Sequence, residues 1–243
     1  MPTTPHLIDL HANRAWPATT TRHHHGWLLR HTPGVTRNRS NSALPPHPQH
    51  HPHHHIDAIE TFYTQRGLTP RIQVTPAHQH TELDTHLTQR GYTTASPTLV
   101  LTAPTTIATT APTPPITLTP TPTHHWLTTH HQLTGHDDTP ILTRIHTPTA
   151  FAHLNIDGHT AGIALFTAAP GWAGVFCMAT HPHHRRTGVA TALLHAGAAW
   201  ATRNGAHRLY LQVERDNHAA RRLYATTGFT ETHRYHYRIA PRP

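Results

Sequence analysis

The sequence predicts a mixed α/β (α+β) fold, and two observations carry this prediction. In the second half of the 243-residue chain, short apolar runs separated by turn residues follow the order β-β-β-α-β-α-β. A pattern of helix, glycine, strand, helix, glycine and aromatic strand also occurs in both halves, with Gly67 and Gly91 matching Gly205 and Gly228. A repeat of this length indicates two similar domains in tandem. A chance likeness of helix and strand rhythm is the alternative.

The second half of the chain carries the clearest element signals. Asp157-Gly158 is a two-residue hairpin signal, Gly205 is typical of the residue after a helix, and Asn217 is a typical residue before one. The predicted strands are 151–156, 160–166, 172–180, 209–213 and one or two within 229–239, and the predicted helices are 188–203 and 217–227.

The first half has weaker signals. The repeat predicts a helix ending at Gly67, a strand at Ile72–Val74 and a second helix ending at Gly91. Gly26–Arg30 and Arg39–Ser42 fit a strand and a turn.

Two biased segments lie between the predicted elements. His47–His55 is of low complexity, which indicates an exposed loop. Ala103–Thr123 is rich in Thr and Pro, and we expect an edge strand around Ile116–Leu118 followed by a stiff linker. We therefore place the two domains at 1–119 and 120–243.

Composition narrows the class of protein. The formal net charge is +8, all 19 basic residues are Arg, and they are scattered without a nucleic-acid-binding motif. We therefore do not expect a nucleic acid as partner, although a basic nucleic-acid binder stays an alternative that predicts strongly salt-dependent binding.

A single cysteine, Cys177, fits a reducing compartment. The first residues resemble no signal peptide, and no run is long enough to span a membrane. We expect a cytoplasmic monomer or homodimer that does not bind a membrane.

The turn between the predicted strand 172–180 and the following helix could hold a phosphate. Gly188 allows close backbone approach, the N–H groups of the first helical turn point outward, and the helix dipole favours an anion there. Arg185 and Arg186 add positive charge. Taken alone, this strand–glycine–helix pattern is not specific.

Two motifs at the right separation resemble the GCN5-related N-acetyltransferase (GNAT) superfamily. Arg185, Gly188 and Ala190 match its Arg/Gln-x-x-Gly-x-Gly/Ala motif, and Thr180-x-Pro182 is similar to its Val-x-Pro. The second motif, Asn-x-x-Ala-x-x-Leu-Tyr-x-x-x-Gly-Phe, is matched by residues 217–229. The resemblance covers about residues 124–239.

The resemblance implies a central mixed, mostly antiparallel sheet flanked by helices, and transfer of an acyl group from a co-substrate, acetyl-CoA, to an amine acceptor. The donor would be held by the end of the splayed third strand, the phosphate loop and the second motif. The residues expected to bind it are Met178, Ala179, Thr180, Arg185, Arg186, Thr187, Gly188, Val189, Ala190, Asn217 and Tyr224.

The resemblance also implies catalytic roles. Tyr224 would protonate the departing CoA thiolate as a general acid; a core aromatic on the helix is the alternative. Asn217 would meet the donor near its thioester, and it can serve as a helix cap at the same time. Gln212 stands where some relatives have a Glu base, so Glu214, two residues on, becomes the candidate base. His181, His236, a water chain or a neutral amine are the other options.

The first half shows the repeat without the site. No glycine lies between Val35 and Arg66, so nothing there resembles the phosphate loop, and His86-Leu87 replaces the Leu-Tyr pair. We expect a degenerate GNAT-like unit that packs against the active one, as in tandem GNAT proteins, and therefore one active site.

The residues leave three questions open. A non-catalytic acyl-CoA-binding sensor or scaffold is the alternative to an enzyme, and neither the amine acceptor nor the acyl group can be read from the residues.

The runs His23–His25 and His47–His55 lack a Cys or carboxylate partner, so we expect no functional metal site, adventitious binding apart. Cys177 is expected to be a small core residue rather than a nucleophile.

Overall fold

A computed structural model of the chain describes residues 4–47, 52–107 and 115–241. The predicted loop 47–55 and the predicted linker 103–123 therefore lie partly outside the described residues. By their contacts, the residues form two compact units: unit 1 comprises Met1–Val100, Glu214–Asp216 and Glu231–Pro243, and unit 2 comprises Leu101–Val213 and Asn217–Thr230. These units differ from the sequence-based division at 119/120, because residues 101–119 group with unit 2 and the end of the chain groups with unit 1.

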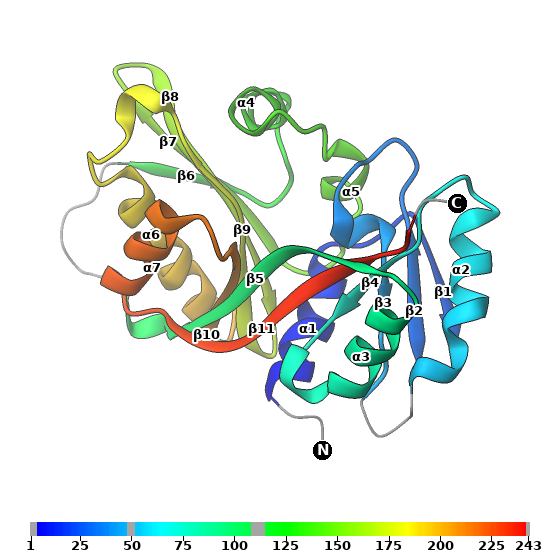
Figure 1. The fold of residues 1–243 in the computed structure, drawn as a ribbon. Helices are drawn as coiled ribbons and strands as arrows, with labels where there is room; N and C mark the ends of the chain where they lie inside the picture. Colours follow the sequence, from blue (N-terminus) through cyan, green and yellow to red (C-terminus); the bar gives the residue numbers. More distant parts are fainter. Residues whose placement is uncertain (1–3, 48–51, 108–114, 242–243) are drawn as a thin grey trace. The chain divides into compact units, whose positions relative to one another are not determined.

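Unit 1 is a sheet with helices packed on it (Figure 1). Its strands follow the order β1-β2-β3-β4-β11-β5. The elements are α1 (Thr4–Ala15), β1 (Thr20–His24), β2 (Trp27–His31), β3 (Ala43–Leu44), α2 (Ile56–Thr64), β4 (Arg71–Val74), α3 (Thr81–Gln89), β5 (Thr93–Pro104) and β11 (Thr230–Ile239).

The core of unit 1 forms between its helices and strands. Ile59 and Phe62 of α2 and Leu87 of α3 are buried in one cluster with Trp27 of β2 and Ile72 of β4. Burying each large apolar side chain contributes roughly 1.5–3 kcal/mol, and this burial offsets the ordering entropy of the short elements. The predicted helix, strand and helix around Gly67 and Gly91 are confirmed as α2, β4 and α3.

The repeat is visible in how the helices end. The N–H of Tyr92 donates to the carbonyl of Leu87 at 3.0 Å, and the N–H of Phe229 donates to that of Tyr224 at 2.9 Å. Both bonds span five residues across a glycine with positive φ, 79° at Gly91 and 85° at Gly228. This is the Schellman cap, in which glycine takes the left-handed conformation at no side-chain cost.

The last strands of the two repeats have exchanged places. In the sequence repeat, β4 corresponds to β10 (Ala206–Glu214) and β5 corresponds to β11. In unit 1, however, β4 pairs antiparallel with β11, with Tyr237 opposite Gln73. In unit 2, the strand beside β10 is the end of β5. The first repeat therefore receives β11 from the second, and the second has the end of β5, from Leu101 on, beside β10.

Unit 2 contains the predicted β-β-β-α-β-α series (Figure 1). Its strand order is β5-β10-β9-β8-β7-β6, mostly antiparallel, with β10 parallel to β9. Besides β10 and the end of β5, the elements are β6 (Ile116–Thr119), α4 (His124–Thr134), α5 (Thr139–Leu142), β7 (Thr149–Ile156), β8 (His159–Ala169), β9 (Gly171–Thr180), α6 (Val189–Arg203) and α7 (His218–Thr226).

The predictions for this half agree with the structure, apart from one strand. Asp157 and Gly158 have φ values of 51° and 78°, as a tight hairpin between β7 and β8 requires. The strand predicted at 116–118 is an edge strand, as expected, but it pairs antiparallel with β7 in unit 2. The sequence-based division placed this strand at the end of the first domain, because turn composition alone does not say which sheet an edge strand joins.

Helices cover both faces of the unit 2 sheet, and strand alternation explains which face each one takes. Gly197 of α6 lies against Phe166 of β8, so closely that a Cβ would lie 2.0 Å from the ring. On the other face, the Trp126 indole of α4 packs edge-on against Phe151 of β7 and donates to the carbonyl of Ala152 at 3.0 Å. The site described next lies beside α6.

No helix among the described residues has the length and apolar character that crossing a bilayer requires.

Candidate active site

Unit 2 contains a cavity of about 1100 Å³. Three segments form most of it: the end of β9, the loop leading into α6, and the first turns of α7. The residues that line it are Leu133, Thr134, Met178, Ala179, Thr180, His184, Arg185, Arg186, Gly188, Val189, Ala190, Thr191, Asn217, Ala219, Ala220, Arg222, Leu223 and Tyr224. The structure thus brings together every residue predicted to hold the donor except Thr187, whose exposed hydroxyl donates to the carbonyl of His184 at 2.8 Å.

The end of β9 reaches the cavity because the strand leaves its neighbour. The parallel pairing with β10 ends at Val175 and Leu211, although β9 continues to Thr180. On the β8 side, the register shifts between the pairs Ile163–Ala179 and Leu165–Phe176, which marks a bulge. On the β10 side, backbone groups of the last β9 residues therefore face the cavity instead of a strand, while the β8 side stays paired at Ala179 and Thr180.

The bulge also changes one prediction about the core. Cys177 lies at this bulge with a φ of 50° and is only partly buried, whereas we expected a core residue. A bulge rotates the strand locally, which moves a side chain out of the regular in–out alternation.

The loop from Thr180 to α6 presents backbone donors. Arg186 and Gly188 both have left-handed φ values, 64° and 87°. Gly188 is the N-cap residue of α6 and makes no side-chain cap, so the first N–H groups of the helix are left for a ligand. Such a turn, followed by the positive end of a helix dipole, suits a phosphate or pyrophosphate.

A close helix–strand contact holds this loop in place. A Cβ on Gly162 of β8 would lie 2.6 Å from Val189 Cγ1 and 3.2 Å from Leu193 Cδ1. Only glycine lets the start of α6 approach the sheet so closely. The position of the loop therefore depends on a residue that does not line the cavity.

Tyr224 of α7 lines the cavity. Its side chain is buried and packs against the Phe229 ring at a centroid distance of 5.7 Å. Burial raises the pKa of the phenol to about 12, so the hydroxyl is protonated at neutral pH. The core-aromatic and cavity-lining roles thus coincide in one side chain.

Asn217 caps α7. Its Oδ1 accepts from the backbone N–H of Ala220 at 3.1 Å, which is the helix-cap role expected from the sequence. Asn217 also lines the cavity, and with Oδ1 used by the cap, its amide N–H groups remain as donors toward a ligand.

The charge of the lining is positive. Arg185, Arg186 and Arg222 contribute guanidinium groups, and no carboxylate is among the described residues that line the cavity. The motifs did not indicate Arg222, nor Leu133 and Thr134 at the end of α4. Arg222 lies two residues before Tyr224, a spacing that does not place two side chains on one face of a helix, so the sequence offered no signal for it. The end of α4 joins the cavity through tertiary packing.

None of the three residues considered as general base, Glu214, His236 and His181, lines the cavity. Glu214 is exposed at the end of β10 and does not line the cavity. His236 Nε2 lies 2.7 Å from Asp84 Oδ1 in unit 1, where Arg238 also pairs with that carboxylate. His181 lines a smaller neighbouring pocket of about 450 Å³, together with Arg185.

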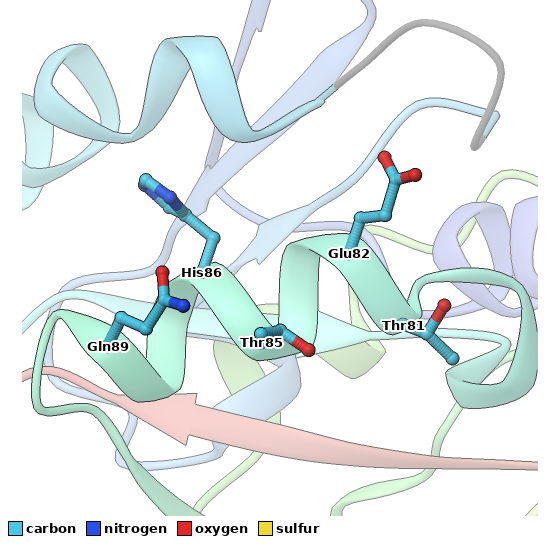
Figure 2. A pocket seen from close by; sticks show the side chains of 5 residues that line it. All are labelled: Thr81, Glu82, Thr85, His86 and Gln89. Carbon is cyan, nitrogen blue, oxygen red and sulfur yellow. The ribbon is translucent and has the colours of Figure 1, made fainter.

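A third hollow lies on the surface of α3 in unit 1 (Figure 2). It has a volume of about 410 Å³ and is lined by Thr81, Glu82, Thr85, His86 and Gln89. All five side chains come from one helix, and no glycine loop is among them. This surface therefore lacks the strand end, the glycine-containing loop and the arginines that line the unit 2 cavity.

A family model and a curated relative match this chain. The family model described as "Probable histone acetyltransferase Rv0428c C-terminal" matches residues 7–238. The uncharacterized N-acetyltransferase YobR of Bacillus subtilis (strain 168) is 38% identical over 69 residues, a match that spans 28% of this chain and 28% of that relative.

Solved structures show the same fold at low identity. A GCN5-related N-acetyltransferase from Kribbella flavida aligns over 100% of this chain and 97% of its own, with a TM-score of 0.74 and 15% identity. A tandem GNAT protein from the clavulanic acid biosynthesis pathway aligns over 100% of this chain and 91% of its own, with a TM-score of 0.62 and 14% identity.

Proposed function

Because the chain belongs to the family described as "Probable histone acetyltransferase Rv0428c C-terminal", and with it to the GNAT superfamily of acyltransferases, we propose that it moves an acetyl group from acetyl-CoA to a primary amine of a small molecule or peptide. The transfer would be direct, with donor and acceptor bound together. The observation that carries this proposal is the unit 2 cavity, in which a splayed strand end, a phosphate-type loop and a buried phenol meet.

The donor would be held along these three parts. The pantetheine arm is an amide chain, and the outward backbone groups of Met178–Thr180 can pair with it as a strand would. The pyrophosphate fits the loop Arg185–Ala190, where backbone N–H groups, the helix dipole and guanidinium groups all favour an anion. Asn217 would then lie on the thioester side, next to Tyr224.

The reaction needs two proton transfers. The amine nitrogen attacks the thioester carbonyl carbon, a C–N bond forms, and the C–S bond breaks. The sulfur leaves as a thiolate and takes a proton from the Tyr224 hydroxyl, whose raised pKa keeps that proton in place until it is needed. Because the described lining residues include no carboxylate, the acceptor amine enters neutral, its nitrogen releases a proton to water as the amide forms, and the Tyr224 phenolate regains a proton from water.

Release of CoA thiol in the presence of acetyl-CoA and a panel of amines tests the proposal. The panel should include lysine peptides from histones, since the family description names that substrate. We expect turnover with at least one amine. In Tyr224→Phe, kcat should fall about 10- to 100-fold while the Kd for acetyl-CoA changes less than about twofold.

Tyr210→Phe is the matched control, because Tyr210 is a buried tyrosine of the same unit that does not line the cavity. Its kcat should stay near that of the wild type. Tight CoA binding without turnover on any amine would instead support the sensor or scaffold alternative.

A further inference from the structure

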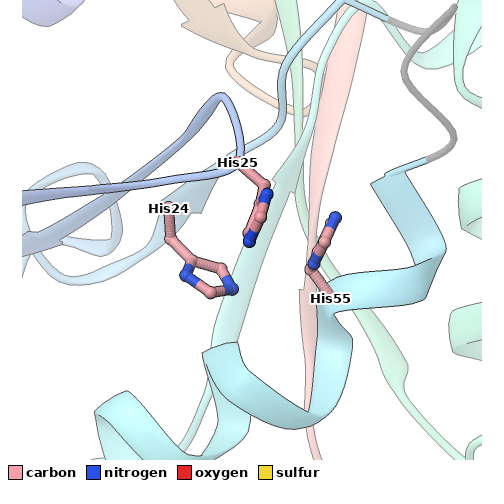
Figure 3. Close-up of side chains that lie close together, drawn as sticks. All are labelled: His24, His25 and His55. Carbon is pink, nitrogen blue, oxygen red and sulfur yellow. The ribbon is translucent and has the colours of Figure 1, made fainter.

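Three histidines from two distant segments meet in unit 1 (Figure 3). His24 ends β1, His25 lies in the β1–β2 turn, and His55 immediately precedes α2. Each offers one ring nitrogen, and these atoms all lie within 4.8 Å of one another. Figure 3 shows the three rings turned toward a common space, with those of His25 and His55 stacked at a centroid distance of 4.4 Å.

Both segments are anchored by the core beside them. His55 is followed by Ile56, which is 1% exposed, and the turn is followed by Trp27, which is 0% exposed; both belong to the same buried cluster. The turn itself is fixed from another side, because a Cβ on Gly26 would lie 2.8 Å from Pro46 Cβ. The backbone that carries the three imidazoles is therefore already in place, and only side-chain rotation remains.

The ligand set indicates a borderline transition metal. Imidazole suits Zn²⁺, Cu²⁺ and Ni²⁺, whereas Mg²⁺ and Ca²⁺ prefer oxygen ligands, and none of the three side chains supplies oxygen. Zinc binds imidazole nitrogen at about 2.0–2.1 Å, which places two tetrahedral ligand atoms about 3.4 Å apart. Nitrogens that lie within 4.8 Å of one another reach that spacing when the stacked rings rotate.

We propose that His24, His25 and His55 form a three-histidine site for a divalent metal ion of the zinc type. The fourth position would be taken by water, since His25 is exposed. The chain as a whole has 31 histidines, but among the described residues this is the group of three or more whose ligand atoms converge. Density of histidine in the sequence alone did not predict it, because the convergence joins residues about thirty positions apart.

The site would act as a clamp in unit 1. A bound ion would cross-link the β1–β2 turn to the start of α2, two segments that are about thirty residues apart in the sequence. An ion that binds the folded state and not the unfolded one raises the melting temperature with concentration.

Cobalt(II) titration of the metal-stripped full-length protein tests the proposal. Visible absorption of tetrahedral Co²⁺ should saturate at one ion per chain, and Zn²⁺ should displace it. We expect the His25→Gln and His55→Gln variants to lose this band or to weaken binding at least 10-fold, and to lose the rise in melting temperature with Zn²⁺. His23→Gln is the matched control, because the exposed His23 precedes His24 in the same strand and is not part of the group.

Two results would overturn the proposal: a band in both site variants as strong as in the wild type, or equal loss in the His23→Gln control. A measurement on the wild type guards against misfolded variants. Acylation of histidines by diethylpyrocarbonate, mapped by mass spectrometry, should slow at His24, His25 and His55 when Zn²⁺ is present. Unchanged modification of these three residues would contradict the site as well.

Discussion

At Tyr224, burial changes the chemistry of a single side chain. The phenol keeps its proton to a pH of about 12, well above that of an exposed tyrosine. Tyr63 and Tyr235 are also buried, and burial likewise raises the pKa of each. Because the folded chain holds these protons more tightly than the unfolded chain, the phenols link stability to alkaline pH.

We expect the free energy of unfolding to decrease above about pH 10, the pKa of an unperturbed tyrosine. In the unfolded chain, the tyrosines ionise near that pH, whereas in the folded chain the raised pKa values keep them neutral. Their contribution is therefore fully present below the unfolded pKa and is lost as the pH rises through the folded pKa values. Urea unfolding followed by tryptophan fluorescence at about pH 8, 10 and 11 measures this. Equal stability at the lowest and highest of these pH values would contradict the assignment of buried neutral phenols.

Gly188 gives a second prediction at this scale. Its φ of 87° is costly for any other residue, although a Cβ at this position would have no atom within 4 Å. Gly188→Ala should lose about 1 kcal/mol of stability through backbone strain alone. The distorted loop should also weaken acetyl-CoA binding at least fivefold, as measured by calorimetry.

Gly205→Ala is the matched control for that substitution. Gly205 has a φ of 77°, equally open surroundings and no place in the cavity lining. It should lose similar stability and keep its affinity for acetyl-CoA. If both variants lose affinity equally, the loss comes from backbone strain at the ends of α6, and the loop at Gly188 has no specific role in binding acetyl-CoA.

At the scale of elements, α7 combines a cap with a ligand contact. Asn217→Ala should cost about 1 kcal/mol of stability, because the N–H of Ala220 loses its acceptor. Asn217→Asp keeps an acceptor there and so should keep the stability. It removes the amide donors, however, and its negative charge lies beside the arginines of the cavity.

The pair of variants separates the two roles of Asn217. We expect acetyl-CoA affinity to fall in both, but thermal stability to fall only in Asn217→Ala. Denaturation midpoints and calorimetric Kd values, measured side by side, test this. Full affinity in Asn217→Asp would show that the residue is a cap and nothing more.

Elements with local signals could be predicted from the sequence. The Asp157-Gly158 hairpin, the capped helices and the phosphate-type loop each depend on a few neighbouring residues, and each was found where expected. Arg222, Leu133 and the bulge at Cys177 could not be predicted. Their places depend on how separate elements pack, and no local spacing encodes that.

At the scale of the whole chain, the exchange of last strands was beyond sequence reasoning. The repeat correctly indicated two copies of one helix–strand series. It could not show that β11 pairs with β4, because the apolar pattern of a strand does not name the strand beside it. The partner of a strand is decided by side-chain contacts such as the one between Arg238 and Asp84, whose atoms lie 2.7 Å apart although 154 residues separate them.

This exchange predicts that the chain cannot be cut into two working halves. A fragment of residues 1–119 lacks β11, including the buried rings of Tyr235 and Tyr237. A fragment of residues 120–243 lacks the strand beside β10. We expect each fragment alone to show little cooperative unfolding by circular dichroism, and the two mixed together to regain it. A cooperative transition in either isolated fragment would contradict the exchange.

The position of β11 also has a consequence for biosynthesis. The ribosome makes β11 after every other element of units 1 and 2, so the edges of β4 and β5 that face it stay unpaired until those elements have been translated. Open strand edges recruit other chains. Unit 1, although it is encoded first, must therefore complete its folding after unit 2 has been synthesised, and a nascent chain stalled before Thr230 would be a substrate for chaperones.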